Sequence, residues 1–211
     1  MIIRIIALLV VLIVIIIFGI TYTIKQAQKS PFNSPANFLG ESEQDNDQKT
    51  VVCVGASITH GQVSYNYVNI LSDRFGHDDY QFVNAGINGN LAYNVVKRLD
   101  EIIKCDPDYV TVLIGTNDAN ASLSEKNSSR YMNDMALPEK PNAGFFRRNI
   151  KELIFQLKKQ TNAKIAILSL PPIGEEIKHI AWQRTKEYSE IIQGIAAVSY
   201  THLTLPTNRE V

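Results

Sequence analysis

The chain has 211 residues, enough for one domain with additional segments. Its 21 basic and 21 acidic residues leave no net charge, so the composition does not indicate a nucleic-acid-binding protein. The only two cysteines, Cys53 and Cys105, do not make a disulfide framework, and without clustered histidines they give no recognisable zinc site. We therefore expect two buried thiols, no bound metal and no other cofactor.

The first strong pattern along the chain is an uncharged, largely apolar run over residues 5–24. Twenty helical residues span about 30 Å, the hydrocarbon thickness of a bilayer. A cleaved signal peptide would have a shorter apolar region and a small-residue cleavage site, and this run offers neither. Residues 1–24 are therefore predicted to form an uncleaved single-pass transmembrane anchor. A short N-terminal tail usually stays in the cytoplasm, which would place the domain in an extracytoplasmic position, although the flanking charges leave the orientation open.

Residues 25–49 are rich in Gln, Asn, Ser and Pro, and they end in a run of alternating acidic residues. Such a composition cannot bury enough apolar surface to order itself, so it predicts a disordered polar linker. The acidic residues read as part of a solvated spacer rather than as a metal site.

From residue 50 onward, short apolar runs alternate with segments whose apolar residues recur at helical spacing. The third run is nearly all apolar, which indicates a strand covered on both faces. The alternation predicts right-handed βαβ units and a parallel α/β sheet. The predicted strands cover residues 50–54, 80–84, 109–114 and 164–168.

Three polar stretches follow the first three predicted strands, and they read G-A-S-I-T (55–59), N-A-G-I-N-G-N (84–90) and G-T-N-D (115–118). Ligands of parallel sheets bind beyond the carboxyl ends of the strands, so these stretches are expected to converge. Each also has a simpler reading alone, as a capped turn, a Gly-rich connection or an Asx turn. The phosphate-binding motifs G-x-x-x-x-G-K-[ST] and G-x-G-x-x-G are absent.

Taken together and in this order, V-G-A-S-I-T, N-A-G-I-N-G-N and L-I-G-T-N-D resemble the first three signature blocks of the SGNH hydrolases, the GDSL-type esterase and lipase superfamily. The resemblance covers residues 50–197 and implies a flavodoxin-like three-layer α/β sandwich, here preceded by the transmembrane helix. It further implies that Ser57 is the nucleophile. The oxyanion hole would be formed by the backbone N–H groups of Ser57 and Gly86 with the side chain of Asn117. One departure is that the family's G-D-S is G-A-S here, so Ala56 cannot make the hydrogen bonds of an aspartate.

The implied reaction is hydrolysis of carboxylic acyl esters carried by a small molecule, a lipid or a carbohydrate. Fixed donors aimed at the developing oxyanion would lower the barrier to attack on the ester. The alternative is a non-catalytic binding domain on the same fold, which would bind carbohydrate or lipid at a cell surface.

A serine hydroxyl attacks an ester only when a base takes its proton. In the family that base is a histidine in a late D-x-x-H block. His60 is expected at the surface, and His77 and His179 are expected to be solvated. His202 lies in the right part of the chain, but Ser199 stands where the aspartate would be.

The segment holding His202, V-S-Y-T-H-L-T-L-P-T-N-R-E-V over residues 198–211, is similar to the translation of a transposase-end sequencing adapter. We therefore expect a C-terminally truncated domain over residues 50–197, followed by a non-native tail that belongs to no element. Without the histidine block, this chain should hydrolyse esters poorly. The alternative is a genuine strand over residues 199–205.

The long polar connection over residues 120–144 is read either as a lid or substrate wall, or as a solvated insertion.

Overall fold

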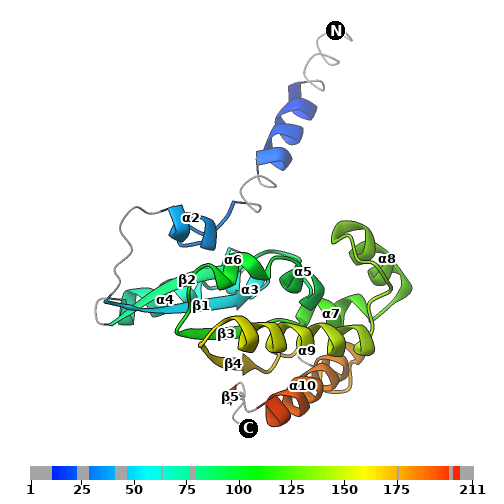
Figure 1. The fold of residues 1–211 in the computed structure, drawn as a ribbon. Coiled ribbons are helices and arrows are strands. Elements are labelled where there is room, and N and C mark those ends of the chain that lie inside the picture. Colours follow the sequence, from blue (N-terminus) through cyan, green and yellow to red (C-terminus); the bar gives the residue numbers. More distant parts are fainter. Residues whose placement is uncertain are drawn as a thin grey trace, which may run out of the picture. The chain divides into compact units, whose positions relative to one another are not determined.

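The protein is described here by a computed structural model (Figure 1). It divides into two units, residues 1–30 and residues 31–211, and each is described by itself. The residues described are 11–22, 29–40, 47–62, 64–76, 79–174, 176–199 and 202–204.

In the first unit, residues 11–22 form a helix whose large apolar side chains are exposed, with Phe18 reaching 71%. Among the described residues, no helix is both long enough and apolar enough to cross a membrane. Residues 5–10 and 23–24 of the predicted span lie outside the described part of the chain. The predicted transmembrane helix is therefore not supported here.

Residues 31–40 differ from the prediction of a disordered linker. They contain a short helix, α2 (Pro35–Gly40), in which Pro35 and Phe38 are buried. Backbone and side chain also join this segment to the second strand: the N–H of Asn84 donates to the carbonyl of Asn33 at 2.8 Å, and Nδ2 of Asn33 donates to the carbonyl of Phe82 at 3.0 Å. One aromatic anchor and a few hydrogen bonds thus hold a largely polar segment on the domain. Residues 41–46 lie outside the description.

The second unit is built on a parallel sheet with the strand order β2-β1-β3-β4-β5, which confirms the predicted parallel α/β fold. The chain reverses its direction of winding between β1 and β3, and ligands of open α/β sheets bind at such a point. The strands are β1 (Lys49–Gly55), β2 (Tyr80–Gly86), β3 (Tyr109–Leu113), β4 (Lys164–Leu168) and β5 (His202–Thr204).

Helices connect the strands in sequence, as Figure 1 shows. The apolar stripe between β2 and β3 is divided at Arg98, whose φ of −114° and ψ of 22° separate two short helices. The helices of this unit after α2 are α3 (Ser57–His60), α4 (Tyr67–Phe75), α5 (Ala92–Lys97), α6 (Leu99–Ile103), α7 (Thr116–Ala121), α8 (Glu125–Asp134), α9 (Ala143–Gln160) and α10 (Ile180–Ser199).

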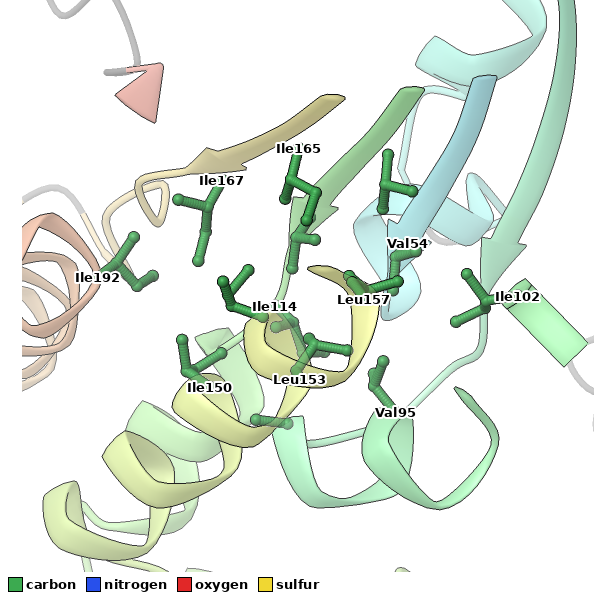
Figure 2. Packing of buried hydrophobic residues seen from close by; sticks show 14 of the residues in the cluster. Val54, Val95, Ile102, Ile114, Ile150, Leu153, Leu157, Ile165, Ile167 and Ile192 are labelled. Atoms are coloured by element: carbon green, nitrogen blue, oxygen red, sulfur yellow. The ribbon is translucent and has the colours of Figure 1, made fainter. Parts of the chain in front are cut away.

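The main hydrophobic core lies between one face of the sheet and the helices α5, α6, α9 and α10 (Figure 2). Alternate strand residues point into it, because successive side chains of a strand lie on opposite faces. The sheet contributes Val52, Val54, Val83, Val110, Val112, Ile165 and Ile167, and the helices contribute Val95, Ile102, Ile150, Leu153, Leu157 and Ile192 among others.

The opposite face of the sheet has a smaller buried cluster, made by Val51, Cys53 and Val68 of α4. On β3, Val110 and Val112 are buried, whereas the alternate residues over 109–113 are only partly buried. Tyr109 packs against the smaller cluster, so both faces of this strand are covered, one of them only in part.

The C-terminal segment also differs from the prediction. Helix α10 continues to Ser199, and residues 202–204 pair in parallel with β4 as β5. The edge of β4 offers unpaired backbone groups, and a short extended segment can pair with them whatever its side chains are. Residues 200–201 and 205–211 lie outside the described residues.

Candidate active site

The carboxyl ends of the first three strands, β1, β2 and β3, lie together at one end of the sheet. Gly55, the last residue of β1, is in register with Gly86 at the end of β2 and with Leu113 at the end of β3. The three polar stretches that follow these strands therefore begin side by side, as expected from a parallel sheet.

Ser57 is the first residue of the single-turn helix α3 and is half-buried. The turn that leads into it is tight. A Cβ on Gly55 would lie 2.0 Å from Oγ1 of Thr59 and 2.7 Å from the carbonyl oxygen of Leu113. A glycine is required there, because only a residue without a side chain lets β1 turn into α3 this closely.

Asn84 and Gly86 join the end of β2 to α3. Nδ2 of the fully buried Asn84 donates to the carbonyl of Thr59 at 2.9 Å, while its Oδ1 accepts the N–H of Gly86 at 3.0 Å. A Cβ on Gly86 would lie only 2.2 Å from the backbone nitrogen of His60. Gly86 thus allows α3 to pack on β2, and its N–H is engaged by Asn84 rather than directed to a substrate.

The connection after β2 continues as a turn over residues 87–90, closed by the N–H of Asn90 donating to the carbonyl of Ile87 at 3.2 Å. Gly89 has a φ of +80°, a conformation that favours glycine. The carbonyl of Asn90 accepts Nδ2 of Asn117 at 2.9 Å. The turn after β2 and the motif after β3 are therefore linked directly.

Asn117 is a half-buried residue in the first turn of α7, and its carboxamide is held from both ends. In addition to the bond from Nδ2 to Asn90, its Oδ1 accepts the hydroxyl proton of Tyr131 at 3.0 Å. An amide nitrogen carries two hydrogens, and the bond to Asn90 uses one of them.

Asp118, the next residue, is almost completely buried. Its carboxylate accepts the N–H of Ala92 at 3.1 and 3.3 Å and so ties the start of α7 to the start of α5. Burial raises the pKa of this carboxyl from about 3.8 to about 7, against the opposing effect of the Ala92 hydrogen bond. No role for Asp118 followed from the sequence.

Arg98 is a second residue that the sequence analysis missed. Its guanidinium donates to the carbonyls of Gly55 and Ala85 at 3.3 and 2.7 Å, to Oδ1 of Asn90 at 2.8 Å and to Glu101 at 2.8 Å. Burial lowers the pKa of Arg98, while Glu101 raises it. The available signal was a lone cation inside an otherwise apolar helical stripe.

Comparison with known proteins agrees with this arrangement. A model of the GDSL-like lipase/acylhydrolase family matches residues 53–206, which is most of the chain. The chain belongs to the GDSL-like lipase/acylhydrolase family. It is an ester-hydrolysing serine hydrolase, as the three motifs implied.

Solved structures with this fold include acetyl xylan esterases. The enzyme AlAXEase is 25% identical, with a TM-score of 0.62 over 74% of this chain and 76% of that chain. Axe2 of Geobacillus stearothermophilus is 17% identical, with a TM-score of 0.60 over 74% of each chain. Catalytic mutants of Axe2 replace a serine, an aspartate and a histidine. No curated protein matches the chain.

The histidines of this acylhydrolase are placed differently from one another. His60 is only 7% exposed, so the expectation of a surface residue is wrong; it packs at the end of α3, where its N–H donates to the carbonyl of Ala56. His179 is exposed, and its Nδ1 accepts the N–H of Ala181 at 3.2 Å. His77 lies outside the described residues.

The backbone of His202 begins β5, opposite Ala166 of β4. Ala166 is in turn in register with Thr111 and, through it, with Cys53. His202 is therefore level with Cys53 across the sheet, two residues before β1 ends at Gly55. Its backbone does not lie at the strand ends from which the turn to Ser57 begins.

Cys53 and Cys105 are free and buried, which confirms the prediction of two buried thiols. Burial raises the pKa of the Cys53 thiol to about 11 and that of Cys105 to about 12. Within the described ranges, no group of three or more His, Cys, Asp or Glu residues could hold a metal ion.

The connection over residues 120–144 is folded. Helix α8 brings Tyr131, and the segment after it brings Leu137, into a second hydrophobic cluster with Leu91 and Phe145. Figure 1 shows α8 beside α7 at one end of the domain. The segment therefore forms a wall next to the motif that carries Asn117, and it is not a solvated insertion.

Proposed function

We propose that this protein hydrolyses carboxylic esters with Ser57 as the nucleophile. Oγ of Ser57 would attack the acyl carbonyl carbon, the alcohol would leave, and water would then release the acid from the acyl-enzyme. This proposal is carried by the register of the strands, in which Gly55 at the end of β1 lies opposite Leu113 at the end of β3. The turn to Ser57 and the motif that holds Asn117 therefore begin side by side. The N–H of Ser57 and the second hydrogen on Nδ2 of Asn117 would hold the oxyanion.

A third donor is expected from the connection after β2. Gly86 was the sequence-based candidate, but its N–H donates to Asn84. We propose that Gly89 takes this role, because its turn is joined to Asn117 through the carbonyl of Asn90. The absence of a side chain at Gly89 makes room for Met135, whose Cε lies 2.5 Å from where a Cβ would be.

The base that activates Ser57 is not assigned to a described residue. Axe2 has a catalytic histidine and aspartate by its mutants, which favours a histidine here by analogy. The register of His202 and the buried position of His60 support neither of them as that base. The expectation of poor ester hydrolysis by this chain therefore stays a prediction, and His202→Ala should leave its remaining turnover unchanged.

For the substrate, we propose short acyl esters, with acetyl groups on carbohydrate as the first candidates. The support is the similarity to AlAXEase, described as an acetyl xylan esterase and 25% identical to this chain. Lipid and other small-molecule esters compete with this proposal. Hydrolysis of acetylated xylo-oligosaccharides compared with p-nitrophenyl esters of increasing chain length separates them.

Attachment to a membrane through residues 5–24, with the domain on the extracytoplasmic side, is a further proposal. It is supported by the length of the uncharged run and by the apolar side chains exposed around the helix over residues 11–22. The protein should fractionate with membranes, and protease added outside intact cells should release the domain. Recovery of a soluble protein that begins near residue 25 would instead identify a cleaved signal.

The catalytic proposal is tested by labelling with a fluorophosphonate, which reacts with an activated serine. Labelling should occur on the intact protein and be absent from Ser57→Ala. Asn117→Ala should lower the turnover of p-nitrophenyl acetate about 100- to 1000-fold, because one oxyanion donor is removed. A folded protein that neither labels at Ser57 nor hydrolyses esters, but binds carbohydrate or lipid, would favour the binding-domain alternative.

A further inference from the structure

Helix α8 is connected to the proposed oxyanion donor by a single side chain. Tyr131 lies on the buried side of α8, with only 8% of its surface exposed, and its ring packs in the cluster with Leu91 and Phe145. Its hydroxyl leaves this apolar cluster to donate to Oδ1 of Asn117 at 3.0 Å.

The direction of this hydrogen bond is fixed by its neighbours. Nδ2 of Asn120 donates to the hydroxyl of Tyr131 at 3.3 Å, and Oδ1 of Asn120 accepts Nδ2 of Asn127 at 3.1 Å. The tyrosine oxygen is therefore the acceptor for Asn120, and its own proton goes to Asn117. Donors and acceptors thus run in one direction from α8 to Asn117 in the first turn of α7.

The orientation of the Asn117 carboxamide decides whether it can stabilise an oxyanion. A rotation of the amide by 180° would exchange its nitrogen and oxygen and place a carbonyl oxygen where an N–H is needed. Tyr131 favours one orientation by donating to Oδ1, and the carbonyl of Asn90 favours the same one by accepting from Nδ2.

We infer that Tyr131 is a positioning residue, which acts through Asn117 to hold the amide N–H toward the oxyanion. This inference rests on the proposed function of Asn117. It gives the α8 segment a role in the chemistry itself in addition to its role as a wall. Removal of the hydroxyl leaves Oδ1 of Asn117 without its donor, and only the bond to Asn90 then maintains the orientation.

The decisive variant is Tyr131→Phe, which keeps the ring and removes one oxygen. The loss of one hydrogen bond in the transition state should lower kcat for p-nitrophenyl acetate about five- to tenfold. KM should stay close to that of the unmodified protein. The melting temperature should fall only slightly, because Asn117 and Asn120 are half-buried and water can replace the hydroxyl. Tyr93→Phe is the matched control, because the Tyr93 ring packs on Phe145 in the same cluster. Its kcat should not change.

Two further measurements separate positioning from a structural role. In an Asn117→Ala background, Tyr131→Phe should have no additional effect on kcat, because it acts through the missing amide. NMR of the full-length protein provides the second measurement. The side-chain NH₂ resonances of Asn117 are identified by their loss in Asn117→Ala. They should shift in Tyr131→Phe and remain unchanged in Tyr93→Phe.

Failure of the inference is distinguishable from failure of the proposed function. If Ser57→Ala hydrolyses the ester as fast as the unmodified chain, the catalytic proposal fails. The NMR resonances of the Asn117 NH₂ group then show by themselves whether Tyr131 orients that side chain. An unchanged Asn117 NH₂ signal in Tyr131→Phe would overturn the inference. So would a loss of kcat of equal size with and without Asn117.

Discussion

Asn84 donates its side-chain amide to the carbonyl of Thr59 at 2.9 Å and thereby fastens the helix that begins at Ser57 to the neighbouring strand. The same carboxamide accepts the N–H of Gly86 at 3.0 Å. One fully buried side chain thus satisfies backbone groups of two segments that meet at the edge of the sheet. A buried polar group that loses such a partner lowers the free energy of unfolding.

Asn84→Ala should lower the free energy of unfolding by about 2–4 kcal/mol, because the Thr59 carbonyl and the Gly86 N–H lose their partner inside the protein. Urea denaturation measures this difference. Asn162→Ala, in the connection before β4, is the control because Asn162 is exposed, and its stability should stay within about 0.5 kcal/mol. Equal stability of the two variants would show that the Asn84 bonds contribute nothing to folding.

Gly86→Ala and Gly194→Ala should change stability in opposite directions. A Cβ at Gly86 meets backbone atoms of α3 at 2.2 and 2.7 Å, so α3 must move away from β2, at a cost of about 2 kcal/mol or more. Gly194 lies in α10, where a Cβ has no neighbour within 4 Å. Alanine there should stabilise the protein by about 0.5–1 kcal/mol. Thermal melts of both variants provide the comparison, and a stable Gly86→Ala protein would contradict the close packing.

Arg98→Met should destabilise the protein by about 3 kcal/mol, because it leaves two carbonyls at the strand ends and the carboxylate of Glu101 in α6 without their donor. Arg98→Lys should restore only part of the loss, since an ammonium cannot reproduce the fork of the guanidinium. Arg184→Met offers a matched control, because each arginine pairs with a glutamate three residues further along its helix, Glu187 for Arg184 and Glu101 for Arg98. The side chain of Arg184 is more exposed than that of Arg98, 29% against 14%. Its loss should cost about 1 kcal/mol or less. Similar losses in chemical denaturation for both methionine variants would refute the special role of Arg98.

Asp118→Asn should change the dependence of stability on pH. The folded carboxyl has a pKa raised to about 7, above its ordinary value of 3.8. Its contribution is therefore fully present below about pH 4 and is lost as the pH rises through about 7. An asparagine keeps an oxygen for the Ala92 N–H and does not ionise. Melting temperatures between pH 4 and pH 8 should fall less steeply for Asp118→Asn than for the unmodified protein, and parallel curves would disprove the assignment.

The parts of the fold predicted best are those determined by local composition. The predicted strand over residues 164–168 coincides with β4, because a short apolar run between polar turns leaves little choice of element. The three motifs were placed correctly at one edge, since parallel strands bring their carboxyl ends together. In contrast, α2 and β5 form through contacts with distant strands. No pattern indicated α2, and a strand over residues 199–205 was only the alternative to a tail outside the fold.

The same distinction applies to the site. The candidate role of Ser57 was predictable because the turn that presents it is local. The involvement of Arg98, Asp118 and Tyr131 was not, because each acts on atoms that lie far away along the chain. Gly86 shows the limit most clearly: its position in the motif was recognised, but only the structure assigns its N–H to Asn84.

The docking of α2 on the domain also limits how far the protein can reach. A free chain over residues 25–49 could extend about 85 Å, at roughly 3.4 Å per residue. Because the second unit begins at residue 31, only residues 25–30 remain between it and the apolar run, and they extend about 20 Å at most. The ordering of residues 31–40 therefore shortens the free spacer of the anchored protein proposed above to about a quarter of the length that the composition indicated.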